Sequence, residues 1–192
     1  MKVLRAPNPS LRAETKTVQK ITSGLLQTLR EMVKLTKTFK DPEGVGLAST
    51  QVGLDGKFFV AKKVENTSDV GSDPLREASS SEVKDFNIVI NPEITWTSKR
   101  SKVYFEGCLS IPNYWGEVER FLMVKVKYLK PSGEVVQKTL KGLEAHIFQH
   151  EIDHLNGILF IDKVMQQKGK FYKVTGKDKT GADIFEEVGL TI

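Results

Sequence analysis

The chain has 192 residues, of which 39% are hydrophobic and 28% charged, a balance typical of a globular protein with a sizeable core. No apolar run reaches membrane-spanning length, and the start lacks the apolar core of a signal peptide, so we expect a cytoplasmic location without membrane association. The net charge of +5 comes from scattered lysines, which favours a solvated surface over specific nucleic-acid binding.

The first half of the chain predicts one helix and one strand. Residues 21–39 carry Leu25, Leu29 and Val33 at helical spacing, with Thr22 or Ser23 as the cap, and the helix is expected to end before Pro42. The glycine-punctuated residues 41–53 are typical of a loop or strand edge, and residues 57–64 predict a strand. Residues 65–85 are polar and predict an exposed insertion within a single domain that spans residues 1–192.

The second half of the chain predicts strands around one further helix. Residues 87–96 and 102–111 predict two strands, and residues 121–140 predict a hairpin around a Pro-Ser-Gly turn. Residues 143–156 predict a helix that stops at Asn156-Gly157, and the tail beyond residue 170 predicts strands. We therefore expect an α+β fold, with mixed, mainly antiparallel sheets packed around a central helix that carries a His-Glu-x-x-His motif.

This motif lies in the stretch QHEIDHLNG and indicates a metal site. Residues four apart lie on one face of a helix, so His150 and His154 can direct their imidazoles at one ion. Glu151 between them is suited to act as a general base toward water. The alternative is a chance pair of histidines on a solvated helix face, which we consider less compatible with a chain of only three histidines.

A catalytic site needs a third protein ligand. One large protease group places a histidine six residues after the motif, but this chain has Phe160 there, which cannot coordinate a metal. His146 is a rival, although His146 to His154 spans about 12 Å along a straight helix, too far for one tetrahedral site. The remaining candidate is Cys108, the single cysteine, whose thiolate is a strong ligand for borderline metals.

Three stretches in order, GVGLASTQ, EGCLS and QHEIDHLNG, resemble the signature motifs of peptide deformylase, and the similarity covers Met1 to about Val164. The resemblance implies a hydrolase that removes the formyl group from N-terminal formyl-methionine of new polypeptides, with N-formylmethionyl peptides as its partners. It implies one divalent metal ion, Fe²⁺ in the active form, with Zn²⁺, Ni²⁺ or Co²⁺ as substitutes. It implies that Cys108, His150 and His154 are the metal ligands and that Glu151 is the general base and later the proton donor. It also implies that Gln51 and the backbone N–H of Leu109 donate hydrogen bonds to the formyl oxygen.

The resemblance also implies a substrate pocket, and the chain departs from the family pattern at Trp115, at the insertion of residues 65–85, which is longer than in compact relatives, and in its tail. The peptide would lie as an added strand, and the residues expected to contact it are Val45, Gly46, Tyr104, Glu106, Gly107, Leu143, His146 and Ile147. Trp115 falls near where many relatives carry an arginine that contacts the substrate. Within the pocket, Tyr104 and His146 are more polar than the residues that the family leads us to expect. The strand-forming tail differs from the helix that some members use near the ribosome, so ribosome proximity is left open.

Arg120 is expected to pair with Glu106 or Asp153 and so brace the metal-bearing helix, since buried acids usually need partners.

Two other classes of function stay open on the sequence. One is a zinc-dependent endopeptidase, which Phe160 and the lack of a marked downstream ligand disfavour. The other is a binding module that has lost turnover, which the joint presence of Gln51, Cys108, His150, Glu151 and His154 disfavours.

Overall fold

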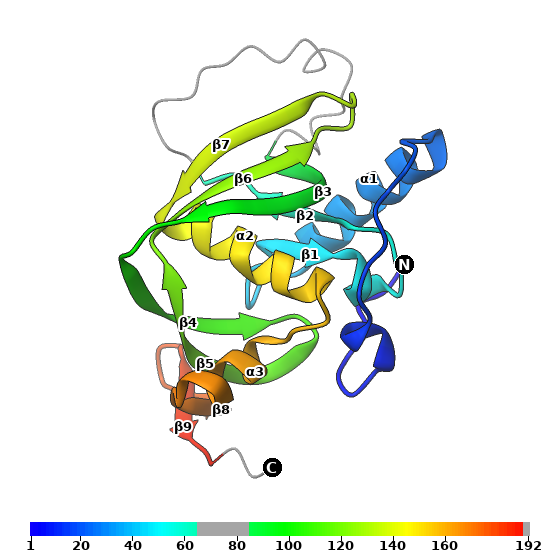
Figure 1. Ribbon diagram of the computed structural model, residues 1–192. Coiled ribbons are helices and arrows are strands. Elements are labelled where there is room, and N and C mark those ends of the chain that lie inside the picture. The colour runs from blue at the N-terminus through cyan, green and yellow to red at the C-terminus, as the bar shows by residue number, and fades with distance from the viewer. Residues whose placement is uncertain (65–84, 190–192) are drawn as a thin grey trace.

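The computed structural model describes residues 1–64 and 85–189, and the predicted insertion falls almost wholly outside them. Within these residues, two antiparallel sheets and three α-helices make up a mixed α+β fold (Figure 1). The larger sheet has the order β1-β2-β3-β6-β7, with strands Gly46–Ala48, Phe58–Lys62, Phe86–Thr97, Met123–Leu129 and Val135–Lys141. The smaller has the order β4-β5-β8-β9, with strands Ser101–Cys108, Ile111–Phe121, Phe171–Lys177 and Asp183–Glu187.

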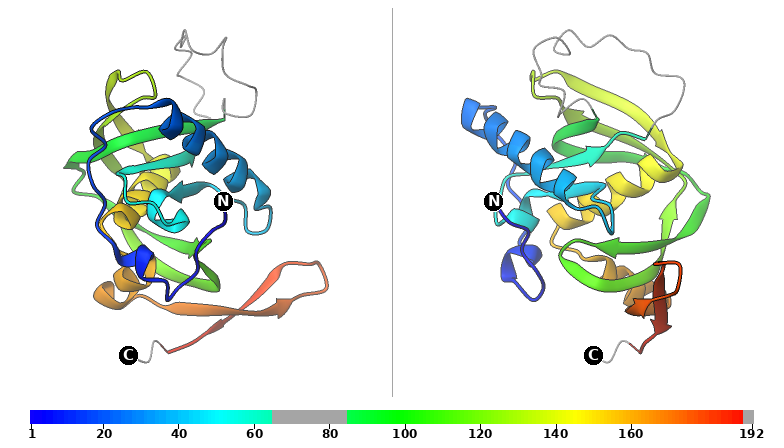
Figure 2. Two further views of the ribbon diagram at one scale, coloured as in Figure 1. Left: turned by 90° about the vertical axis from the view of Figure 1, so that its right-hand side faces the viewer. Right: turned by 180° about the vertical axis from the view of Figure 1, so that it is seen from behind.

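Helix α1, Ser23–Thr38, begins as predicted, because Thr22 Oγ1 accepts a hydrogen bond from the backbone N–H of Leu25 at 3.2 Å. Helix α1 lies on the face of the larger sheet away from α2, as the two views in Figure 2 show. Its buried residues Leu29, Met32 and Val33 pack against that sheet. Strand β2 therefore has both faces buried: Phe58 and Val60 pack with α1, whereas Phe59 and Ala61 pack with α2. This two-sided burial explains why β2 is a continuous apolar run.

Helix α2, Gly142–Leu155, lies between the two sheets (Figure 1) and carries the His-Glu-x-x-His motif. Phe148 and Ile152 pack into the core of the larger sheet. The helix ends at Asn156, and Gly157 follows with φ +69°, where the carbonyl of Arg12 leaves no room for a side chain. Tertiary packing on the larger sheet thus holds the motif-bearing face toward β4 and β5.

The predicted hairpin is confirmed as β6 and β7, and the predicted tail strands are confirmed as β8 and β9. The sequence did not predict β5 or the helix α3, Phe160–Gln167. Strand β5 contains Pro112, an Asn113 with φ +68°, and Gly116, which interrupt the alternation that marks a strand. No helix among the described residues is long and apolar enough to cross a membrane.

Candidate metal centre and active site

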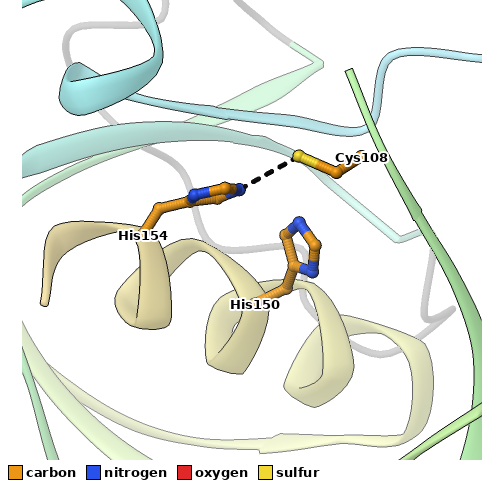
Figure 3. A group of neighbouring side chains, drawn as sticks. All are labelled: Cys108, His150 and His154. Atoms are coloured by element: carbon orange, nitrogen blue, oxygen red, sulfur yellow. Dashed lines mark hydrogen bonds between the residues drawn. The ribbon is translucent and has the colours of Figure 1, made fainter. Parts of the chain in front are cut away.

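Three soft or borderline donor side chains converge between β4 and α2. Cys108 ends β4, and His150 and His154 lie one turn apart on α2 (Figure 3). Cys108 Sγ lies 3.2 Å from His154 Nε2, and the donor atoms of all three residues lie within 4.8 Å of one another. Donor atoms around one tetrahedral zinc-sized ion would lie about 3.5 Å apart, from the usual metal–sulfur and metal–nitrogen distances. The set therefore fits one first-row metal ion.

Glu106 fixes the ring orientation of His150. It is 2% exposed and accepts four hydrogen bonds, from Arg120 Nε and Nη2 at 2.7 and 3.0 Å, His146 Nε2 at 2.8 Å and His150 Nδ1 at 3.0 Å. Burial alone would raise the pKa of Glu106, but these donors outweigh burial and hold the pKa far below its usual value. An ionised carboxylate can only accept, so His150 donates through Nδ1, and Nε2 is the ring nitrogen that can offer its lone pair to a metal once it is deprotonated.

Arg120 joins β5 to α2, as the sequence led us to expect, and it pairs with both candidate acids. Its Nη1 lies 2.5 Å from Asp153 Oδ2, in addition to the two bonds to Glu106, and its side chain is 5% exposed. Burial would lower the pKa of Arg120, yet the two carboxylates raise it above its ordinary value. The network is thus a buried, charge-assisted connection between the strands and the helix that carries the histidines.

His154 is suited to bind a cation as a neutral ring. It is 1% exposed, and its Nδ1 has no hydrogen-bond partner within the described part of the chain. Burial, followed by the nearby positive groups, holds the pKa of His154 well below its usual value. Its Nε2 faces Cys108, so the lone pair of a neutral ring points into the donor set.

Glu151 lies between the two histidines and faces β1. It is 3% exposed, and its Oε2 has no hydrogen-bond partner among the described residues. Burial raises its pKa to about 7, with a further rise from the charge of Glu106 and an opposing effect of His150. A Cβ added at Gly46 would overlap Glu151 Oε1 and lie 2.7 Å from its Cδ. Only glycine at position 46 leaves room for this carboxylate.

We therefore expect the substitution Gly46→Ala to lower the rate of the reaction by about 10² through displacement of the Glu151 carboxylate, with metal content unchanged. Gly24→Ala is the matched control, since a Cβ there meets only Thr22 Oγ1 at 3.8 Å, an ordinary contact in α1. Kinetics with metal analysis of both variants check this. A Gly46→Ala protein with the rate of the Gly24→Ala protein would show that Glu151 tolerates displacement.

Gln51 lies in the short 3-10 helix η2, Ser49–Val52, and directs its amide N–H toward the donor set. Its Oε1 accepts the backbone N–H of Ala48 at 2.8 Å, which turns its Nε2 toward Cys108 Sγ at 3.4 Å and Ser110 Oγ at 3.1 Å. Leu109 follows Cys108 in the turn between β4 and β5 and lines the same cavity. The structure thus brings both residues that were predicted to hold an oxyanion to the predicted metal centre.

A cavity of about 250 Å³ opens beside the donor set. Six of the eight predicted pocket residues line it, namely Val45, Gly46, Glu106, Gly107, His146 and Ile147. The predicted residues Gln51, Cys108, Leu109, His150 and Glu151 line it as well, together with four that were not assigned to the site, namely Pro42, Glu43, Phe105 and Trp115.

Two predicted pocket residues, Tyr104 and Leu143, do not line this cavity. Leu143 is 52% exposed, because it lies in the first turn of α2, beyond the end of the cavity. Tyr104 instead stacks on the ring of His146, with centroids 4.2 Å apart. The imidazole of His146 is thus held between Tyr104 and Glu106 and stays outside the metal donor set.

Comparison with known proteins agrees with this geometry. Residues 1–170 match the model of the polypeptide deformylase family. A peptide deformylase of Thermotoga neapolitana is 40% identical over 161 residues, 84% of this chain and 85% of the relative, and one of Mesorhizobium japonicum is 37% identical over 177 residues, 90% and 91% of the two chains. The crystal structure of the Thermotoga maritima peptide deformylase superimposes with a TM-score of 0.68 at 38% identity, covering 84% of this chain and 95% of that one. This chain belongs to the polypeptide deformylase family.

Proposed function

We propose that this protein is a metal-dependent hydrolase that removes the formyl group from N-formylmethionyl peptides and releases formate. The observation that carries the proposal is the burial of Glu151 in the same cavity as the Cys108, His150 and His154 donor set, in a chain of the polypeptide deformylase family. In this proposal residues 1–192 form one cytoplasmic catalytic domain organised around α2.

Cys108, His150 and His154 would hold one divalent cation, and Fe²⁺ is our choice for the active form, with Zn²⁺, Ni²⁺ or Co²⁺ as substitutes. When bound, the cation supplies Lewis acidity toward the formyl carbonyl and toward water. Glu106 would support this role from outside the donor set, because its hydrogen bond to His150 Nδ1 fixes the ring and leaves Nε2 as the nitrogen that would bind a metal.

Glu151 is the group that moves protons. Its carboxylate is buried with one oxygen unpartnered, so it can accept a proton from the attacking water and later return that proton to the leaving amine. Gln51 Nε2 and the backbone N–H of Leu109 would donate to the formyl oxygen as negative charge develops on it. Since Ala48 holds Gln51 Oε1, the amide need not reorient during the reaction.

The substrate peptide would lie between two sheet edges. Strands β1 and β4 are the terminal strands of the two sheets as described, and both contribute residues to the cavity. An extended peptide in this position could use their free main-chain groups, which do not distinguish side chains. The methionine side chain would enter the cavity beside Ile147, where the imidazole of His146 narrows it.

The experiment that tests this function is formate release from a formyl-Met peptide by protein purified without oxygen, compared with cleavage of an unformylated protein. We expect formate and no internal cleavage. Internal cleavage would identify an endopeptidase. Metal-loaded protein that binds the formyl peptide without releasing formate would identify a binding module, and either result would overturn the proposal.

A further inference from the structure

The C-terminal hairpin forms part of the molecule that the family match, which ends at residue 170, does not cover. Strand β8 pairs with β5 and β9 pairs with β8, so the hairpin extends the smaller sheet (Figure 2). Near the end of β8, Lys177 Nζ lies 2.7 Å from Asp41 Oδ2 and 3.0 Å from Asp183 Oδ1. Asp41 directly precedes Pro42 and Glu43, which line the cavity. The hairpin thus connects β5 with the loop that contributes Pro42 and Glu43 to the cavity.

Four aromatic side chains form a continuous group across this sheet, one from each strand, and we call Phe105, Trp115, Tyr172 and Phe185 the aromatic patch. The ring of Phe105 stacks on Trp115 with centroids 5.3 Å apart and an angle of 10° between the planes. Its edges also meet Tyr172 at 5.3 Å and Phe185 at 5.0 Å, and Phe185 meets Trp115 at 6.0 Å. These distances and angles are the stacked and edge-to-face arrangements that aromatic rings favour.

The sheet register places the patch on one face. Gly107 pairs with Trp115 and Trp115 pairs with Tyr172, so these positions form one row across β4, β5 and β8. Phe105 lies two residues before Gly107 and therefore faces the same way, opposite to the buried Glu106. Trp115 covers Gly107 closely, since a Cβ at Gly107 would lie 2.9 Å from the indole ring.

The patch is ordered by its neighbours and yet exposed. Tyr172 donates its hydroxyl hydrogen to Glu117 Oε1 at 3.1 Å, which fixes the ring. Phe105 is 43% exposed and Phe185 is 39% exposed. Grouped, fixed and exposed apolar rings are typical of a surface that binds a ligand. Phe105 and Trp115 also line the cavity, so the patch continues directly from the site of reaction.

We propose that the aromatic patch binds the side chain of the second residue of the formylated peptide and favours apolar and aromatic residues there. This inference rests on the proposed function. Side chains alternate along an extended peptide, so when the methionine side chain enters the cavity on the Glu106 face of β4, the next side chain points to the Phe105 face. Trp115, which stacks on Phe105 and lines the cavity, is then an apolar contact for the second residue.

The test compares formyl-Met-Phe and formyl-Met-Ser peptides of otherwise identical sequence by the ratio of their kcat/KM values. We expect the unmodified protein to favour the phenylalanine peptide by about threefold to tenfold, and Phe185→Ser to bring the ratio close to one. Ile184→Ser is the matched control, because Ile184 is the neighbouring residue of β9, is 45% exposed, and points to the opposite face. This control should keep the ratio of the unmodified protein.

Phe185→Leu is a second variant that separates loss of binding from a folding defect, because leucine preserves apolar volume in β9 and removes only the ring contacts. We expect its ratio of kcat/KM values for the two peptides to be intermediate. An unchanged ratio in both Phe185 variants would overturn the inference, and so would an equal change in Ile184→Ser. The absence of formate from every peptide would instead overturn the proposed function, and the two failures are therefore distinguishable.

Discussion

Glu151→Gln is expected to lower kcat for formate release by about 10²–10⁴, the usual contribution of a positioned general base and acid, while the protein keeps its metal. The glutamine amide has nearly the same shape as the carboxylate but cannot accept the proton of the attacking water. The metal is retained because Cys108, His150 and His154 supply the donors and Glu151 lies outside that group. Rate and metal content are measured on the same sample.

Glu144→Gln is the matched control for this substitution. Glu144 lies on the same helix and is also buried, but it accepts hydrogen bonds from Lys138 Nζ at 2.8 Å and Asn87 Nδ2 at 3.4 Å, away from the cavity. We expect its turnover to stay within a factor of about two to three, because Glu144 does not line the cavity and takes no part in the reaction. Wild-type turnover in Glu151→Gln at full metal occupancy would remove Glu151 from the chemistry.

Arg120→Met is expected to cost about 3–5 kcal/mol of the free energy of unfolding, the usual cost of removing one partner from a buried ion pair. The substitution leaves the buried Glu106 and the partly buried Asp153 without their cation. Glu106 then holds the His150 ring less firmly, and losses of supporting contacts of this kind typically lower metal affinity by about 10–100-fold. Urea unfolding and competition with a chelator measure the two effects.

Arg12→Met controls for the loss of any arginine. Arg12 also pairs with an acid, Asp162, but its side chain is 47% exposed, so water replaces the lost contact and the cost should stay below about 1 kcal/mol. Equal stability of the two variants, with unchanged metal affinity, would contradict the bracing role of Arg120. In Arg120→Met/Glu106→Gln the buried charge at position 106 is also gone, so part of the lost stability should return.

Local signals explain which elements the sequence predicted. Helix α1 has a capping Thr22, and the β6–β7 hairpin has strict alternation around a proline–glycine turn, so both are encoded within short windows. Strand β5 is not encoded in this way, because Pro112 and Asn113 break its pattern and its pairing with β4 and β8 holds it in place. Element boundaries and types that depend on such distant partners are invisible to a local pattern.

The donor set was predictable from the sequence, whereas the cavity wall was predictable only in part. The motif fixes the spacing of His150 and His154 on α2. The chemistry of a thiolate singles out the one cysteine as the third ligand, although Cys108 lies on strand β4, far from α2 in the sequence. Whether a residue lines the cavity depends instead on its position along its helix or strand relative to the cavity. Leu143 lies one helical turn before Ile147 on the same face of α2, yet that turn carries it past the cavity. Phe105 lines the cavity because of the register in which β4 pairs with β5, and the sequence of β4 alone does not reveal that register.

The most direct test of metal-dependent deformylation is a titration of metal-free protein with Fe²⁺ in the absence of oxygen. Formate release is the readout. The rate should rise linearly and level off at one metal ion per chain, and Cys108→Ala, which loses one of the three donors, should show no such rise. Full formate release by metal-free protein, or by Cys108→Ala at the same added metal, would contradict a reaction carried out at the Cys108, His150 and His154 centre.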